Sequence, residues 1–283
     1  MAVPTSAKEN HKREKNMKTV KTISLLLGVM LLFSGASYAQ NDLRIPLTNP
    51  NSPGKLRVNS VYADDVIIRA HDGNEVRVIV DGEDEDYEDS YNRNGLRKIS
   101  SGGAGVEVTE ENNTVTIKTS SHNDDVDLEI WVPEDFSVFV NLTHGDIMVE
   151  GVNGEHELKA TNGDIEMTAI RGSVVCNSIN GDIEVELLEV TDGAPMSFNG
   201  LNGDIEVSLP SDASFNGKMK TDYGDVYTNF DISINRSGNT TQNSEKDGVY
   251  SITINKWITG TVNGGGPEYL FKTLHGDIEI SKN

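Results

Sequence analysis

The feature that most limits the fold of this chain is a short phrase that returns along the sequence. Asn-Gly-Asp-Ile-Glu at residues 162–166 recurs at residues 180–184. The Gly-Asp pair occurs six times in the second half of the chain, beginning at Gly145, Gly163, Gly181, Gly203, Gly224 and Gly276. The intervals between these glycines are 18, 18, 22, 21 and 52 residues. Self-similarity of this period is typical of a repeat architecture.

Each repeat alternates between apolar and polar residues, as a strand does. The first three Gly-Asp pairs are followed by Ile147-Met148-Val149, Ile165-Glu166-Met167 and Ile183-Glu184-Val185. Glycine, and asparagine before it, tolerate the left-handed backbone of a sharp corner. Gly154 and Gly172 lie midway between the early pairs. The sequence therefore predicts a strand and a corner in every nine residues, and a two-sided coil in every 18.

Stacking such coils places similar side chains in columns that point inward. Two residues after the glycines lie Ile147, Ile165, Val174, Ile183, Ile205, Val226 and Ile278. Four residues after them lie Val149, Leu158, Met167, Cys176, Val185, Val207 and Ile280. Successive coils would lie about 4.8 Å apart and share one continuous core. Cys176 is therefore predicted to be a core residue, and His156, in a similar slot, a partly buried histidine with satisfied hydrogen bonds.

The N-terminus has the pattern of an export signal rather than of a folded segment. Lys18 and Lys21 precede an apolar run from residue 23 to residue 33, which small residues follow. Eleven apolar residues are too few to span a bilayer, which takes about 20. We predict translation from Met17, cleavage after Ala39, and a mature domain of residues 40–283 without a lipid anchor or transmembrane segment.

Charge excludes one class of partner. Removing residues 1–39 takes away six of 24 Lys/Arg and two of 45 Asp/Glu, which leaves a formal net charge of −25. Such a surface repels nucleic-acid phosphates, whose binding depends on Lys and Arg. It suits divalent cations or basic partners, or serves solubility alone. Cys176 is the single cysteine, so no intramolecular disulfide can form.

The remaining segments also indicate strands. Residues 55–61, 66–70, 76–80, 106–120 and 126–136 alternate or run apolar, with turns at 71–73 and 112–113. Residues 82–95 and 231–248 are predicted to be loops. The chain ends almost directly on a strand, "HGDIEISKN". Either an earlier segment folds over that end of the stack, or its edge is open to a partner.

The recurring "GDI" phrases, the lead-in "LEIWVPEDFSVFVNLTHGDIMVEGV" and the ending "GGGPEYLFKTLHGDIEI" resemble the DUF4097 family of adhesin-like proteins. Related bacterial proteins with a head GIN domain are similar. The likeness covers about residues 50–283. It implies an all-β, single-stranded right-handed parallel β-helix (a β-solenoid), exported and without enzymatic activity. It also implies a periplasmic, cell-surface or secreted location in Gram-negative bacteria.

The chemistry of the repeat concentrates in a column of aspartates: Asp146, Asp164, Asp182, Asp204, Asp225 and Asp277. Stacked like charges are destabilising unless they are hydrated, hydrogen-bonded or bridged by cations. The favoured interpretation is that each accepts a backbone N–H at its corner. The alternative is calcium, which binds carboxylate and carbonyl oxygens, with Asp146, Asp164, Asp182 and Asp204 as its candidate ligands.

Other features have ordinary interpretations beside functional ones. His144 and His275 precede corner glycines and are predicted at opposite ends of the array. Gly264-Gly265-Gly266 is read as a plain loop rather than an anion-binding nest. Tyr223, Tyr227 and Tyr250 are read as packing residues rather than a sugar-stacking patch.

No nucleophile elbow, P-loop or pair of histidines with metal-ligand spacing is present in the sequence. We therefore expect no catalytic residues and no cofactor. The expected function is a cell-envelope or surface protein that binds a protein or polysaccharide. The alternatives are a polysaccharide-degrading β-helix enzyme, in which two carboxyls on adjacent coils would act, and an envelope scaffold that pairs through its end strand.

Overall fold

The computed structural model describes residues 42–82, 91–92, 96–97, 106–119, 126–235, 241–246, 249–254 and 257–283. The chain divides into two units, Met1–Gln40 and Asn41–Asn283. Only the second is described here, so the predicted signal peptide lies outside the described residues. Every element in the described ranges is a strand. Within them, no helix has the length and apolarity needed to cross a membrane.

The strands form two rows, which we call face A and face B. In order of pairing, face A consists of β6 (Val106–Glu111), β7 (Thr114–Thr119), the first half of β2 (Gly54–His71), the first half of β9 (Phe136–Glu150), β10 (Asn153–Asn162), the second half of β11 (Ile165–Asn180), β13 (Met196–Asn199), β21 (Glu268–Lys272), β15 (Phe215–Lys220), β20 (Ile258–Val262) and β17 (Ile232–Asn235).

Face B contains the other halves of the long strands. In order of pairing it consists of β1 (Asp42–Pro46), β3 (Glu75–Gly82), β8 (Val126–Pro133), the second half of β2, the second half of β9, the first half of β11, β12 (Ile183–Val190), β14 (Ile205–Leu209), β22 (Ile278–Lys282) and β16 (Val226–Thr228). Two separate antiparallel pairs join β4 (Tyr91–Asn92) to β5 (Leu96–Arg97) and β18 (Thr241–Lys246) to β19 (Val249–Ile254).

Pairing in the middle of the stack is parallel and has the predicted period. Leu158 on β10 lies opposite Val140 on β9 and Cys176 on β11, in each case a step of 18 residues. On face B, Ile165 lies opposite Ile147 and Ile183, with the same step. The chain thus pairs with itself one repeat further on, first on face A and then on face B. The result is a large, mixed, mostly parallel sheet.

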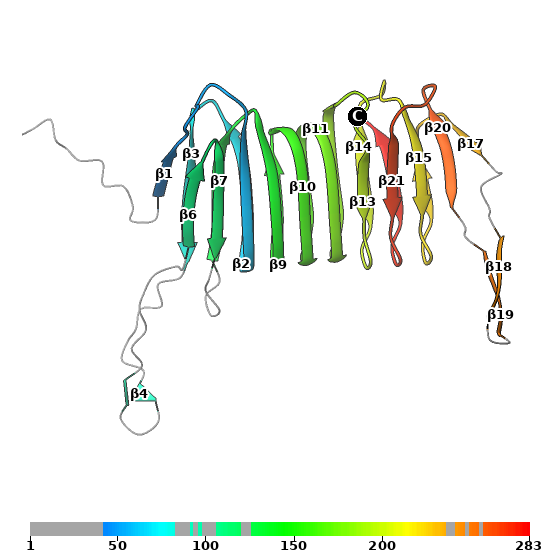
Figure 1. The fold of residues 1–283 in the computed structure, drawn as a ribbon, viewed down its shortest axis with the longest axis horizontal. Helices are drawn as coiled ribbons and strands as arrows, with labels where there is room; N and C mark the ends of the chain where they lie inside the picture. Colours follow the sequence, from blue (N-terminus) through cyan, green and yellow to red (C-terminus); the bar gives the residue numbers. More distant parts are fainter. Residues whose placement is uncertain are drawn as a thin grey trace, which may run out of the picture. The chain divides into compact units, whose positions relative to one another are not determined.

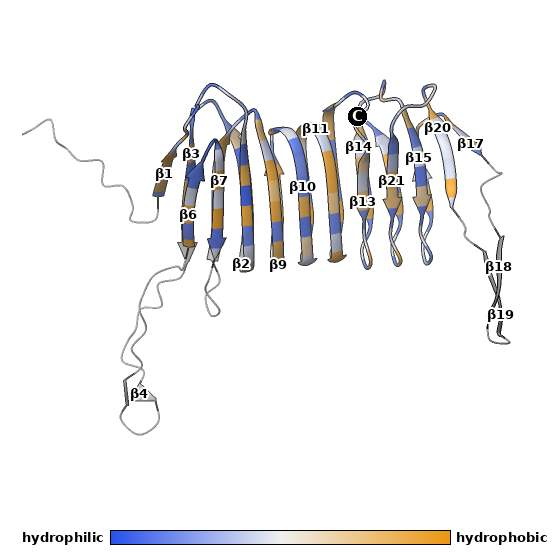
Figure 2. Ribbon diagram, viewed as in Figure 1, coloured by the Kyte–Doolittle hydropathy of each residue, from blue (hydrophilic) through white to orange (hydrophobic). Residues whose placement is uncertain are grey.

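The core lies between the two faces and is filled by the predicted columns. All members of these columns are buried except Val226, which is partly exposed and packs against the core. Hydrophobic and hydrophilic residues alternate along the strands (Figure 2), and this alternation explains why the columns are buried. In a strand, successive side chains point to opposite faces, so alternation buries one set and exposes the other.

The C-terminal strands lie inside the stack and not at its end. β21 pairs with β13 on one side and β15 on the other, and β22 pairs with both β14 and β16. Figure 1 shows β21, in red, between β13 and the yellow β15. Of the two alternatives for the chain end, the first is correct: an earlier segment, residues 215–228, lies beyond it. The C-terminal strand is therefore not an open edge.

Aromatic packing explains this order. Phe271 on β21 stacks on Phe198 of β13 with 5.1 Å between ring centroids. Tyr269 on the same strand stacks on Phe215 of β15 at 4.8 Å. All four rings are buried, and such pairs stabilise beyond the area that they bury. β21 carries two inward aromatic rings, and each of its neighbours, β13 and β15, offers a ring to one of them. β21 therefore fits between these two strands.

One predicted loop is replaced by strands. Within residues 231–248, Ile232–Asn235 forms β17, which pairs antiparallel with β20, and Thr241–Lys246 forms β18. The alternation of Ile232 and Ile234 explains β17. The other predicted loop, 82–95, lies almost wholly outside the described residues. Asn112 and Asn113 form the predicted turn, with φ angles of 52° and 59°.

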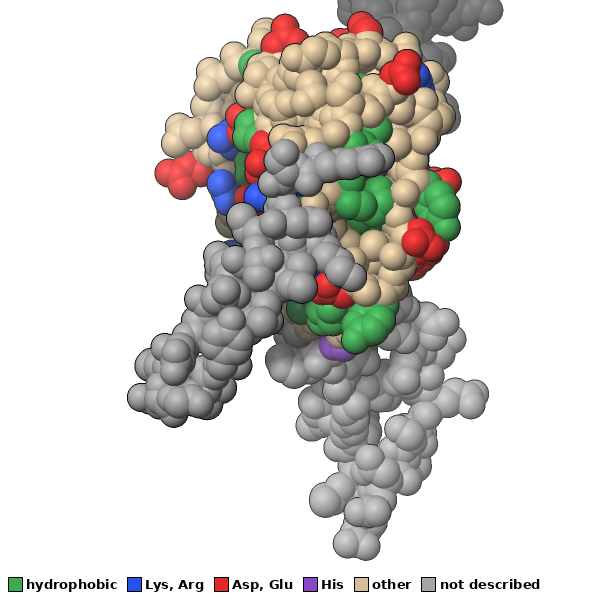
Figure 3. All heavy atoms as spheres, turned by 90° about the vertical axis from the view of Figure 1, so that its right-hand side faces the viewer, with side chains coloured by type: hydrophobic (Ala, Val, Ile, Leu, Met, Phe, Trp, Pro, Cys, Tyr) green, Lys and Arg blue, Asp and Glu red, His purple; other side chains and the backbone are tan. Residues whose placement is uncertain are grey.

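Hydrophobic side chains reach the surface at the end of the stack beyond β15 and β16 (Figure 3). Tyr223, Tyr227 and Ile234, from this end, are 69%, 49% and 55% exposed. The described residues place no further strand beside β16.

Candidate functional site

The six aspartates form one continuous hydrogen-bonded ladder on the outside of the corner. In each step, Oδ1 of one aspartate accepts the backbone N–H of the next, at distances of 2.7 to 2.8 Å. The order in space is Asp146, Asp164, Asp182, Asp204, Asp277 and Asp225. The favoured interpretation is confirmed for the first five of these aspartates, with the refinement that each donor belongs to the neighbouring coil; Asp225, the last, contributes its N–H to Asp277.

The ladder requires glycine before each aspartate. A side chain at Gly163 or at Gly181 would lie 1.9 or 2.1 Å from the carbonyl oxygen of the preceding corner glycine. Their φ angles of 151° and 152° are also ones that other residues rarely adopt. This close backbone approach brings each N–H to the neighbouring carboxylate, which offsets the repulsion of stacked charges.

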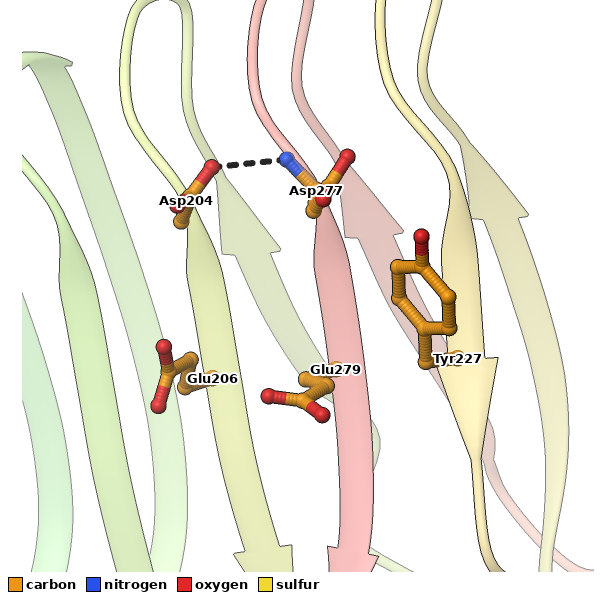
Figure 4. A pocket seen from close by; sticks show the side chains of 5 residues that line it. All are labelled: Asp204, Glu206, Tyr227, Asp277 and Glu279. Carbon is orange, nitrogen blue, oxygen red and sulfur yellow. Dashed lines mark hydrogen bonds between the residues drawn. The ribbon is translucent and has the colours of Figure 1, made fainter.

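A second acidic column runs beside the ladder on face B. It contains Glu166, Glu184, Glu206 and Glu279, in register on adjacent strands, and ends at Tyr227. Asp204, Glu206, Tyr227, Asp277 and Glu279 line a hollow of about 280 Å³ (Figure 4). Partial burial, and then the nearby charges of Glu184 and Glu279, raise the pKa of Glu206.

The described residues contain no group of three or more His, Cys, Asp or Glu side chains arranged to hold a metal ion. Calcium binding by Asp146, Asp164, Asp182 and Asp204 stays a prediction.

A third column, of amides, precedes the corner glycines. Asn202 donates through Nδ2 to Oδ1 of Asn180, and Asn180 does the same to Asn162, both at 2.8 Å. Nδ1 of His275 lies 3.1 Å from Oδ1 of Asn202, and its ring stacks on Tyr223. The prediction that His144 and His275 lie at opposite ends is wrong for both. β2 and β8 lie beyond the coil of His144, and the coil of Tyr223 lies beyond that of His275, because the C-terminal coil is inserted between earlier ones.

The buried titratable groups are Cys176 and His156. Cys176 is fully buried next to Met167, and burial raises the pKa of its thiol, as expected for a core residue. His156 is buried more completely than predicted, at 2% exposure. Nε2 lies 3.3 Å from the carbonyl oxygen of Arg171, but Nδ1 makes no hydrogen bond. The prediction that His156 has its hydrogen bonds satisfied is therefore wrong for Nδ1.

The burial of His156 predicts acid sensitivity. Burial lowers its pKa to about 4, although the carbonyls of Arg171 and Val152 partly oppose the effect. The unfolded chain, with a histidine pKa of about 6.5, binds a proton first as the pH falls, so acid favours unfolding. We expect this residue alone to cost about 2 kcal/mol of stability between pH 7.5 and pH 5.

Urea unfolding of the wild type and of His156→Leu at both pH values would measure this cost as the difference between their pH dependences. Equal pH dependence of the two proteins would contradict the prediction. The subtraction removes the contribution of carboxylates that both proteins share.

A column on face A was missed by the sequence analysis. At equivalent positions on eight neighbouring strands, its side chains are all lysine or asparagine: Lys118, Asn59, Asn141, Lys159, Asn177, Asn199, Lys272 and Lys220. We call it the Lys/Asn column. A signal was present, because the last six of these residues each lie four positions before a corner glycine.

The interpretation of Tyr223 and Tyr227 as packing residues is wrong, because both side chains are exposed at the end of the stack, where Tyr223 stacks on His275. The side chain of Tyr250 lies outside the described part of the chain. Gly264, Gly265 and Gly266 belong to the turn between β20 and β21, as the plain-loop interpretation expects.

Comparison with known proteins decides the family. The profile of the Toastrack DUF4097 family matches residues 98–281. The chain belongs to this family. No curated protein sequence matches this DUF4097 chain. A crystal structure of a putative cell adhesion protein from Clostridium sporogenes is similar at 10% sequence identity, with a TM-score of 0.41, over 86% of this chain and 99% of the other.

Proposed function

We propose that this DUF4097 chain is an exported, non-catalytic binding protein of the cell envelope or cell surface, whose ligand is a protein or polysaccharide. Its fold would be a right-handed parallel β-solenoid. The 18-residue pairing step and the alternation between face A and face B support the coiled path. The charged and apolar pattern of residues 18–39 supports export.

The observation that carries this proposal is that similar outer side chains lie opposite one another on neighbouring strands. The Glu column repeats one side chain over four neighbouring strands and the amide column over three, and the Lys/Asn column keeps to lysine or asparagine over eight. A repetitive surface can engage an extended or repetitive ligand through many weak contacts at once. The Asp ladder and the glycine corners hold these columns in place.

A second candidate function is hydrolysis of a polysaccharide. The raised pKa of Glu206 beside Glu279 favours it, because a protonated and an ionised carboxyl can act as a pair in glycoside hydrolysis. The hollow that holds both is lined by few residues and belongs to a repeated column. A repeated column provides such neighbours at every step, so we give this function second place.

The test measures binding and cleavage together. The purified protein would be incubated with an envelope fraction and with isolated envelope polysaccharides, with calcium or with a chelator. We expect retained protein without new sugar reducing ends. New reducing ends that disappear in Glu206→Gln would establish the enzyme instead. No retention on any envelope fraction would overturn the proposed function.

The same experiment tests calcium through Asp182→Asn. This change keeps Oδ1 as the acceptor for the N–H of Asp204 while it removes one charge. If calcium bridges the Asp ladder, retention depends on calcium in the wild type and less so in the variant. Equal retention with and without calcium would leave the ladder a purely structural element.

A further inference from the structure

Over eight neighbouring strands of face A, the Lys/Asn column combines cations with amides and contains no acid; the next position, on β6, is Glu107. Its eight positions hold four lysines and four asparagines, in a chain with a formal net charge of −21. The Asp ladder and the Glu column lie on the other side of the corner. The outer surface is thus divided by charge, and face A is the side that attracts anions.

The side chains of this column are available for a ligand. Lys118, Asn59, Asn141, Lys159 and Lys272 are exposed, and the other three are half-buried. Lys159 Nζ lies 2.5 Å from Glu157 Oε1, and Lys220 Nζ lies 3.3 Å from Asp222 Oδ1. Both pairs are partly exposed, so exchanging the partner for a ligand carboxylate costs little. Lys118 and Lys272 form no ion pair with the described residues.

Apolar side chains that alternate with Glu157 and Ser197 lie directly beside the column. Two positions earlier on the same strands stand Phe139, Val175 and Leu270, all half-buried. Around Phe139 the surface is hollowed by about 210 Å³, and the hollow is lined by Arg57, Asn59, Phe139, Val140, Asn141, Glu157 and Lys159. The Arg57 guanidinium lies 4.8 Å from the ring centroid of Phe139, which holds the ring in place.

These groups match the parts of a charged sugar. An ammonium binds a carboxylate, and an asparagine side chain both donates to and accepts from hydroxyl groups. An aromatic face packs against the C–H face of a pyranose ring. Neighbouring strands are about 4.8 Å apart. That spacing is close to the length of one sugar residue in an extended chain, so successive sugars can meet successive strands.

We propose that face A binds an acidic, uronate-containing polysaccharide along the Lys/Asn column, with the sugar chain running across the strands and one ring seated at Phe139. The assignment rests on the proposed function and gives its ligand class. Nucleic acid fits less well, because it carries a phosphate at every step and the net charge of the protein repels it. In the Lys/Asn column half of the positions are uncharged.

The experiment uses the purified protein, expressed from the full sequence, and immobilised polygalacturonate as the probe. Dextran serves as the neutral polysaccharide and double-stranded DNA as a different polyanion. We expect binding to polygalacturonate that weakens with added salt, and weak or no binding to dextran and DNA. Lys159→Gln combined with Lys272→Gln should weaken this binding about tenfold, since each screened contact contributes a few-fold. Phe139→Ala should weaken it at low and high salt alike.

The matched control is Lys282→Gln on β22, which removes a lysine from the opposite face. It should bind polygalacturonate like the wild type. Equal binding by the double variant and the wild type, or equally tight binding to DNA, would overturn the assignment. Retention on envelope fractions without affinity for polygalacturonate would overturn it and leave the proposed function intact. A protein that binds neither envelope fractions nor polygalacturonate would overturn both the ligand assignment and the proposed function.

Discussion

Gly181→Ala is expected to destabilise the protein by about 3–5 kcal/mol, the sum of a backbone clash and a strained φ angle. The added Cβ would lie 2.1 Å from the carbonyl oxygen of Gly163 and 2.5 Å from its carbonyl carbon. These are main-chain atoms of the hydrogen-bonded corner between β10 and β11, so they cannot move away as a flexible side chain would. The φ angle of 152° adds strain of its own. Urea unfolding followed by circular dichroism measures the loss.

Gly193→Ala is the matched control. Gly193 also has a positive φ angle, 71°, but a Cβ there would meet no atom within 4 Å. It should cost only about 1 kcal/mol, the price of the left-handed backbone. If both variants unfold at the same urea concentration, the close approach of the corner glycines contributes nothing measurable. The contrast therefore separates stacking of the corners from glycine flexibility.

The repeat unit could be read from the sequence because its determinants are local. A Gly-Asp pair fixes a corner, and the two apolar residues that follow it fix the inward columns. For this reason the burial of Cys176 and of Ile183 was predicted correctly. The hydrogen bonding of the aspartates followed from the same unit, because equal units place equal groups next to one another.

The order of the coils could not be read in this way. The last Gly-Asp pair lies 52 residues beyond the fifth, yet its coil lies between those of Gly203 and Gly224. Nothing in a local pattern specifies which coil a strand will join. The choice depends on the packing of Phe271 and Tyr269 against rings far away in the sequence. The Lys/Asn column had a local signal, because six of its residues lie four positions before a corner glycine. Only its continuation from Asn199 to Lys272 and Lys220 depends on this insertion.

A second large effect is expected from removing residues 277–283. In a stack that ended on its C-terminal strand, this truncation would remove an edge and leave the rest folded. Here it removes β22 from between β14 and β16. It takes away the buried Ile278 and Ile280 and the N–H of Asp277 that Asp204 accepts. Two buried isoleucines alone contribute about 4 kcal/mol or more, comparable to the whole stability of many domains.

We therefore expect the truncated protein to lose the cooperative unfolding of its C-terminal half and to be cleaved between residues 196 and 262 by proteases that spare the wild type. Lys282→Gln, a surface change on the same strand, serves as the control and should behave like the wild type. A truncated protein that unfolds at the same urea concentration as this control would show that β22 is dispensable. Its pairing with two neighbours would then have no energetic consequence. Loss of ligand binding on truncation would, by contrast, report the collapse of face A, because β21 holds Lys272 beside Asn199 and Lys220 only while the inserted coil stays in place.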